Sequence, residues 1–292
     1  MLQTLGAAGM PVLVAPGHAD PAVPSSPYRY LRWPTNVTVA AHEELRPYHF
    51  GDVQIWASGF TRPEVAEAPL RDFARLDGGT HLLLIHASDM TQVPEGVTPF
   101  KPILPSQVEE AGFRHALLGH YHDARTTASV TYPGSPEPLG WSESGRHCIA
   151  LVTIDDGGAM SVTLDDVNAR QFAQETIDIT GMTSPDHVRE AVMSVRGGKH
   201  LDGAVIRTTL VGERSRSLTL DPQALSKECS DGFAYLEVSD RSHVSHDLDA
   251  AAQEFTSRGE MVRKLVDHKP ESRQDENTVG RALQLALDAF DE

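Results

Sequence analysis

Short apolar runs recur through the first 120 residues, and their lengths of four to eight residues are typical of buried strands. Between them we expect a helix near residues 64–76 and a shorter helix in which Ser106 and Glu109 form a capping box. This alternation predicts a layered α/β domain. The apolar runs are VLVA (12–15), VTVA (37–40), VQIWASGF (53–60), HLLLI (81–85) and HALLG (115–119).

The sequence after these runs predicts a hairpin and two further domains. Apolar and polar residues alternate on both sides of an Asp-Gly turn, which predicts a β-hairpin over residues 148–167. Further on, strands are expected at 175–180, 204–212 and 233–239, with helices from Ser184-Pro185 and over 221–230. The expected domains are a core (1–168), a small α+β domain (169–242) and a helical tail (243–292).

The helical tail is expected to contain two helices separated by a charged stretch. Apolar residues on the second helix follow helical spacing, and such a stripe fits either core packing or binding to a partner. These residues are Val279, Leu283, Ala286, Leu287 and Phe290.

Charge and composition limit the classes of function. The formal net charge of −16 repels nucleic acid at long range, so DNA binding requires a local basic patch or a basic partner. With Cys148 and Cys229 as its two cysteines, the chain is not a disulfide framework, and a cytoplasmic location is expected. No apolar run approaches the length of a transmembrane helix, so no membrane partner is expected.

Three of the apolar runs end in loops that contain histidine. VLVA leads to His18, HLLLI to His86, and HALLG to His120 and His122. Any one of these loops alone fits a turn or a structural histidine. Together they occupy the strand ends where α/β sheets bind ligands, and imidazoles that converge there can hold a metal. We therefore predict a metal site, and interpret the remaining histidines as surface or packing residues.

The region around Gly-His-x-His resembles a known protein family. ALLGHYHDA (116–124) followed by VTYPGSPEPLGWSESG (130–145) resembles the calcineurin-like metallophosphoesterases, and most closely their DNA repair exonuclease branch, the SbcD-type nuclease subunits. The Ser-Pro-Tyr-Arg segment (26–29), the middle domain and the tail also fit. The resemblance covers nearly the whole chain. It implies a layered β-sandwich metallophosphoesterase core, incomplete at the N-terminus, with an α+β capping domain and a C-terminal helical tail.

The resemblance assigns roles to the histidines. His18 stands where the family has a metal-binding Asn, while His86, His120 and His122 match metal-binding histidines. In the family, two divalent metals, often manganese, lie about 3.5–4 Å apart and hold the attacking and leaving oxygens of a phosphodiester. Ala19 stands where the family has a His that donates a proton, and loss of such an acid costs about 10² to 10⁴ in rate.

Two further motifs of the family, Asp-x-His and Gly-Asp-x-x-Asp, do not precede VLVA. The chain is therefore expected to hold about half of a two-metal site. One explanation is a truncated or wrongly started gene product. The other is a non-catalytic relative that keeps the capping domain and tail for binding, and truncation does not explain the residues at His18 and Ala19.

Three functions follow from this comparison. The first is a metal-dependent phosphodiesterase, a DNA exonuclease subunit that acts on DNA in repair and binds an SbcC-like ATPase through residues 247–292, with a homodimer also open. The alternative is a non-enzymatic binding or scaffold subunit. A phosphoesterase for nucleotides or small phosphate esters is the third, and the extra residues after the hairpin argue against it.

Overall fold

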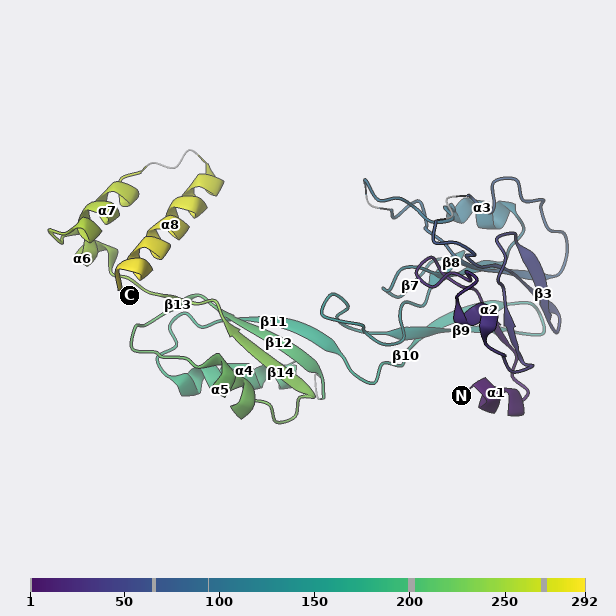
Figure 1. Cartoon of the computed structure of the whole chain (residues 1–292), viewed down its shortest axis with the longest axis horizontal. Coiled ribbons are helices and arrows are strands. Elements are labelled where there is room, and N and C mark those ends of the chain that lie inside the picture. The colour runs from purple at the N-terminus through teal and green to yellow at the C-terminus, as the bar shows by residue number, and fades with distance from the viewer. Residues whose placement is uncertain (1, 65–66, 94, 199–202, 269–271, 292) are drawn as a thin grey trace. The chain divides into compact units, whose positions relative to one another are not determined.

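The computed structural model describes residues 2–64, 67–93, 95–198, 203–268 and 272–291. In this part of the chain, helices and several β-sheets form two compact units, Met1–Ala169 and Arg170–Glu292 (Figure 1). A mixed α/β fold, as expected, is confirmed at this level. None of the described helices is long and apolar enough to cross a membrane.

A six-stranded sheet forms the centre of the first unit, with the strand order β3-β4-β5-β6-β8-β7. The pairs β4-β5, β5-β6 and β6-β8 are parallel, whereas the two outer pairs are antiparallel. Because β5 and β6 run parallel, the loops that follow them leave the same edge of the sheet. The strands are β3 (Arg46–Phe50), β4 (Val53–Ser58), β5 (Thr80–His86), β6 (His115–Gly119), β7 (Arg125–Thr126) and β8 (Val130–Tyr132).

Two smaller sheets complete the strands of this unit. β1 (Val12–Val14) pairs in parallel with β2 (Val37–Val39). β9 (Cys148–Ile154) pairs with β10 (Met160–Asp166) as an antiparallel hairpin, which confirms the predicted one. An apolar groove of about 390 Å³ is lined by residues of β1, β5, β6 and β9.

Three short helices lie in the first unit: α1 (Leu2–Ala7), α2 (Pro27–Tyr30) and α3 (Pro105–Glu110). The predicted capping box at Ser106 is wrong. Pro105 is the first residue of α3, and the side chain of Gln107 accepts a hydrogen bond from the backbone N–H of Leu104 at 2.9 Å. Proline suits this first position because its φ is already helical and the missing N–H would have had no partner.

The helix predicted near residues 64–76 is wrong for the described residues 67–76, while residues 65 and 66 lie outside the described part. Pro69 interrupts the segment, and the chain turns there instead, with Leu70 buried and Phe73 packed against the core. Proline inside a helix removes a backbone hydrogen bond and clashes with the preceding turn. The core that this segment covers also includes Leu83, Ile85, Val108, Phe113 and Leu118.

The second unit contains a three-stranded parallel sheet, β11 (Phe172–Asp178), β12 (Val205–Val211) and β14 (Tyr235–Asp240), in the order β11-β12-β14. Two helices, α4 (Pro185–Gly198) and α5 (Pro222–Glu228), lie on one face of the sheet (Figure 1). Alternate residues of β12, including Ile206 and Leu210, are buried on that face, as expected for strands covered on one side. The strands and helices predicted for this segment are thus present, within a few residues of their expected ends.

In its described residues the tail forms three helices rather than the two predicted: α6 (Leu248–Ala252), α7 (Ser257–Val266) and α8 (Arg273–Asp291). Of the apolar stripe on α8, Leu283 and Leu287 are buried with Val262, whereas Phe290 is half-exposed.

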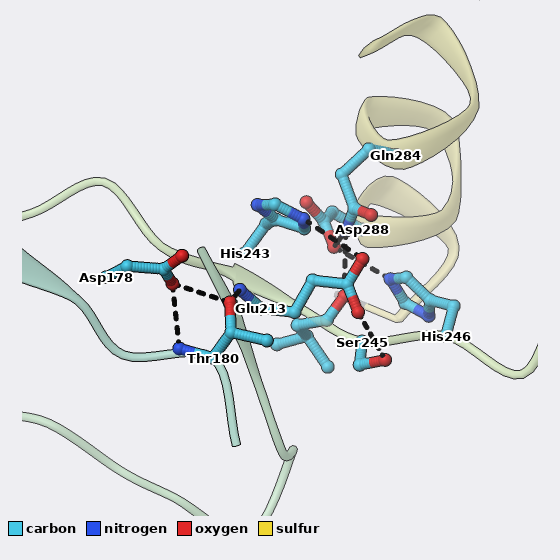
Figure 2. A network of polar contacts seen from close by, with 9 residues as sticks. Asp178, Thr180, Glu213, His243, Ser245, His246, Gln284 and Asp288 are labelled. Atoms are coloured by element: carbon cyan, nitrogen blue, oxygen red, sulfur yellow. Dashed lines mark hydrogen bonds and ion pairs between the residues drawn. The ribbon is translucent and has the colours of Figure 1, made fainter. Parts of the chain in front are cut away.

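Two short strands, β13 (Glu213–Arg214) and β15 (His243–Val244), pair beside α8. Gln284 donates a hydrogen bond to the carbonyl oxygen of Val244 at 2.9 Å, and Asp288 pairs with His246 at 2.9 Å (Figure 2). The side chain of His246 is 3% exposed, so this histidine packs in the interior of the unit, one of the two settings predicted for it.

Candidate metal centre

The loop after β1 brings His18 to the end of the large sheet. The backbone N–H of Phe60, just beyond β4, donates to the carbonyl oxygen of Pro16 at 2.9 Å. A Cβ atom on Gly17 would lie 2.7 Å from Nδ1 of His86, so only glycine lets the loop pass this close. The Pro-Gly pair therefore positions the histidine that follows it.

Asp20 and the segment 26–29 hold this loop in place. One carboxylate oxygen of Asp20 accepts from the N–H of Gly17 at 2.9 Å, and the other accepts from the hydroxyl of Tyr28 at 2.6 Å. Burial, followed by this hydrogen bond and the charge of Asp20, raises the pKa of Tyr28 to about 12. Ser26 caps the short helix that carries Tyr28. Asp20 thus orders the loop around His18.

His18, His86 and His120 meet where the three loops converge, and we call them the histidine cluster. One potential ligand atom from each residue lies within 4.8 Å of the others. Nδ1 of His18 is 2.7 Å from Nε2 of His86, and the His120 ring centroid is 5.3 Å and 5.0 Å from those of His18 and His86. The ring of Phe100 stacks on His18 at 4.1 Å and encloses one side of the cluster.

The surroundings keep two of these imidazoles neutral. Burial, followed by the nearby charges of His120, His18 and Lys101, lowers the pKa of His86 to about 3. Burial also lowers the pKa of His120. A neutral imidazole offers its lone pair to a metal, since no proton has to leave first.

The cluster fits a divalent transition metal. Nδ1 of His120 is inaccessible to water and has no hydrogen-bond partner, which is the condition of an atom available as a ligand. Three imidazoles from three loops form a donor set that suits zinc, iron, nickel or copper, and they leave further coordination positions open. In the described part of the chain, no other group of three His, Cys, Asp or Glu side chains meets the same geometric criterion.

His120 reaches the cluster through an unusual backbone conformation. Its φ is +120°. Among the described residues other than glycine, Lys101 also has a positive φ. Side chains disfavour this region, so the surroundings must hold the residue there.

His122, the fourth predicted ligand, is not brought into the cluster. Its side chain is 52% exposed, and its Nδ1 donates to the carboxylate of Glu143 at 2.5 Å. Burial alone would raise the pKa of Glu143, but the hydrogen bonds that it accepts, led by the one from His122, outweigh burial and lower it. Gly134 packs so closely against the backbone of His122 that a Cβ atom at position 134 would lie 2.4 Å from the His122 carbonyl oxygen.

Ala19 is exposed beside the cluster, and its methyl side chain can neither donate a proton nor bind a phosphate oxygen.

Lys101 near the cluster was missed by the sequence analysis. It is 2% exposed, donates to the hydroxyl of Ser58 at 2.8 Å and to the carbonyl oxygen of Gly59 at 3.0 Å, and lies 4.9 Å from the ring centroid of Phe60. Burial lowers its pKa to about 8. No sequence pattern marks this lysine, because its contacts come from residues more than 40 positions away.

Tyr132 and Arg125 were also missed. The hydroxyl of Tyr132 donates to the carbonyl oxygen of Ala87 at 2.9 Å and accepts from the N–H of Asp89 at 3.0 Å, so it fixes the loop after His86. The sequence feature that could have pointed to Tyr132 is its place in the Tyr-Pro-Gly-Ser run that carries the family resemblance.

The chain matches no protein-family model, and no curated protein is similar to it at a significant level.

Proposed function

We propose that the histidine cluster binds a divalent metal and that the first unit is the metal-dependent phosphodiesterase core of an SbcD-type DNA exonuclease subunit. The observation that carries this proposal is the convergence of three imidazoles from the loop after β1, the last residue of β5 and the loop after β6. Such loops at the carboxyl ends of strands are the usual location of ligand sites in α/β folds.

The segments that resemble the metallophosphoesterases support the proposal, because each has a task around the cluster. Tyr28 of the Ser-Pro-Tyr-Arg segment anchors the His18 loop. Tyr132 and Gly134 of the Tyr-Pro-Gly-Ser run support the loops after β5 and β6. A resemblance in unrelated surface loops would not concentrate in this way.

A divalent metal at such a site supplies Lewis acidity to a phosphoryl oxygen. The protein's own contribution is to hold the three imidazoles in place, with His86 and His120 neutral. The all-imidazole donor set favours zinc, iron or nickel over the manganese that the resemblance suggests. Since Ala19 provides no proton to the leaving group, turnover is expected to be about 10² to 10⁴ slower than in a site with that acid.

The test measures phosphodiester cleavage by the full chain. Linear duplex DNA, bis(p-nitrophenyl) phosphate and p-nitrophenyl phosphate are offered with zinc, cobalt or manganese, and the double variant His86→Ala/His120→Ala serves as the negative control. Slow cleavage of the two diesters is expected, with a higher rate in Ala19→His, which restores an acid. Loss of all diester cleavage from metal-loaded wild type and Ala19→His alike would refute catalysis.

The exposed Ala19 favours a second candidate, a non-enzymatic subunit that binds DNA or an SbcC-like ATPase. The tail is the surface proposed for the ATPase, because Phe255, Leu285 and Phe290 leave apolar area exposed there. This candidate predicts that Phe255→Ser with Leu285→Ser abolishes co-purification with such an ATPase, while no variant at position 19 produces turnover.

A further inference from the structure

Arg125 packs against two aromatic rings next to the histidine cluster. Its guanidinium carbon is 4.5 Å from the ring centroid of Tyr121 and 4.4 Å from that of Tyr132. The antiparallel pairing of β7 with β8 sets Arg125 directly opposite Tyr132. A guanidinium stacks well on aromatic faces, because the ring faces carry partial negative charge. We call these three residues the arginine–tyrosine group.

The arginine–tyrosine group connects the loop that follows His86 with the loop that carries His120. On one side, Nη1 of Arg125 donates to Oε1 of Gln92, and Gln92 in turn donates to Asp89 at 3.2 Å, in the loop after His86. On the other side, Tyr121 directly follows His120, and their ring centroids are 4.6 Å apart. The arginine–tyrosine group thus links the two loops through direct contacts.

The backbone of His120 requires such support. With φ at +120°, this residue occupies a region that side chains disfavour, and strained residues persist only where the surroundings determine their conformation. The ring of Tyr121 contacts both Arg125 and the ring of Tyr132, whose centroid lies 5.0 Å away. A fixed Tyr121 fixes the peptide group that it shares with His120.

The polar atoms of Arg125 are not arranged for stability alone. Its Nε and Nη2 atoms are inaccessible to water and meet no acceptor with good hydrogen-bond geometry. Buried donors without partners destabilise a fold, and unpaired groups of this kind are concentrated at functional sites. The position of Arg125 therefore calls for a role beyond stabilising the β7–β8 turn.

We propose that Arg125 is a positioning residue for the metal centre, which holds His120 at the angle needed to join His18 and His86. This inference rests on the proposed metal site. It predicts that disrupting the arginine–tyrosine group weakens metal binding although every ligand is still present. Removal of groups that orient metal ligands typically lowers metal affinity about 10- to 100-fold.

The experiment compares zinc affinity, by calorimetry with a competing chelator, in wild type, Arg125→Met and Arg125→Lys. We expect a 10- to 100-fold loss in Arg125→Met and a smaller loss in Arg125→Lys, which keeps a cation over the rings. Arg114→Met, which removes an exposed arginine of the same unit, is the matched control and keeps wild-type affinity. The visible absorption of the cobalt-loaded proteins reports whether the ligand geometry has changed.

A second pair of variants decides the question if Arg125→Met does not fold. Tyr121→Phe keeps the ring and the affinity, whereas Tyr121→Leu loses affinity 10- to 100-fold. Equal zinc affinity and an unchanged cobalt spectrum in Arg125→Met, even with lower stability of the metal-free protein, would mean that Arg125 is merely structural. Absence of zinc binding in wild type would instead overturn the metal site itself, and the two failures are thus distinct.

Discussion

The half-buried His86 makes the metal-free first unit sensitive to acid, and His86→Leu should relieve that sensitivity. In the folded protein the pKa of His86 is about 3, against 6.5 for a free imidazole. Below pH 6.5 the unfolded chain therefore binds a proton that the folded chain does not. The stabilisation from the neutral imidazole is complete above pH 6.5 and is lost as the pH falls towards 3.

The size of the effect follows from these two values. Between pH 7 and pH 5, an imidazole that shifts from 6.5 to about 3 on folding lowers the free energy of unfolding by about 2 kcal/mol. Leucine fills a similar volume and cannot bind a proton. Between pH 7 and pH 5, the free energy of unfolding of His86→Leu should therefore fall by about 2 kcal/mol less than that of wild type.

Urea unfolding in EDTA at the two pH values measures this difference. Tryptophan fluorescence reports on the first unit alone, because Trp33, Trp56 and Trp141 all lie in it. His187→Leu, at an exposed position of the second unit, is the matched control and should behave as wild type. Equal losses of stability on acidification in wild type and His86→Leu would refute the reasoning.

Three further changes test other contacts. Gly134→Ala should lower the stability of the first unit by about 1–3 kcal/mol in the same urea assay, because a Cβ at this positive φ meets the carbonyl of His122; wild-type stability would contradict this. Tyr132→Phe removes the hydroxyl that bonds two backbone groups of the loop after β5, and should cost about 1–3 kcal/mol; a neutral result would show those bonds to be unimportant. Gln284→Leu removes the hydrogen bond to the carbonyl oxygen of Val244 and should make amide hydrogen exchange in α8 about 3- to 10-fold faster, as measured by mass spectrometry. Unchanged exchange would show that this hydrogen bond does not stabilise α8.

The positions of His86 and His120 could be predicted from the sequence because the parallel strands β5 and β6 end at one edge of the same sheet, whereas β1, which precedes His18, pairs with β2 in a separate sheet. VLVA, HLLLI and HALLG each contain a described strand, and a histidine at or shortly after the end of each strand reaches the cluster. The separate position of His122 could not be predicted in this way. It depends on Glu143, which is 21 residues further along, and on the path of the loop beyond Gly119.

Other errors and omissions have local or long-range causes. The helix expected near 64–76 is absent from the described residues 67–76, where Pro69 cannot take part in a helix interior. Arg125 and Lys101 could not be recognised, because the aromatic rings, hydroxyl and carbonyl groups around them are assembled only by the fold. Apolar patterns predict strands and buried faces, but they do not predict which polar side chains will meet.

The central claim is that three imidazoles form one metal site, and the most direct test is zinc titration of wild type and four single alanine variants. We expect one zinc ion per chain in wild type. Affinity should fall by more than 100-fold in His18→Ala, His86→Ala and His120→Ala, beyond the loss expected from a supporting contact. His122→Ala should retain binding, because His122 pairs with Glu143 outside the cluster. Undiminished zinc binding in the three cluster variants, or no binding in wild type, would contradict the claim.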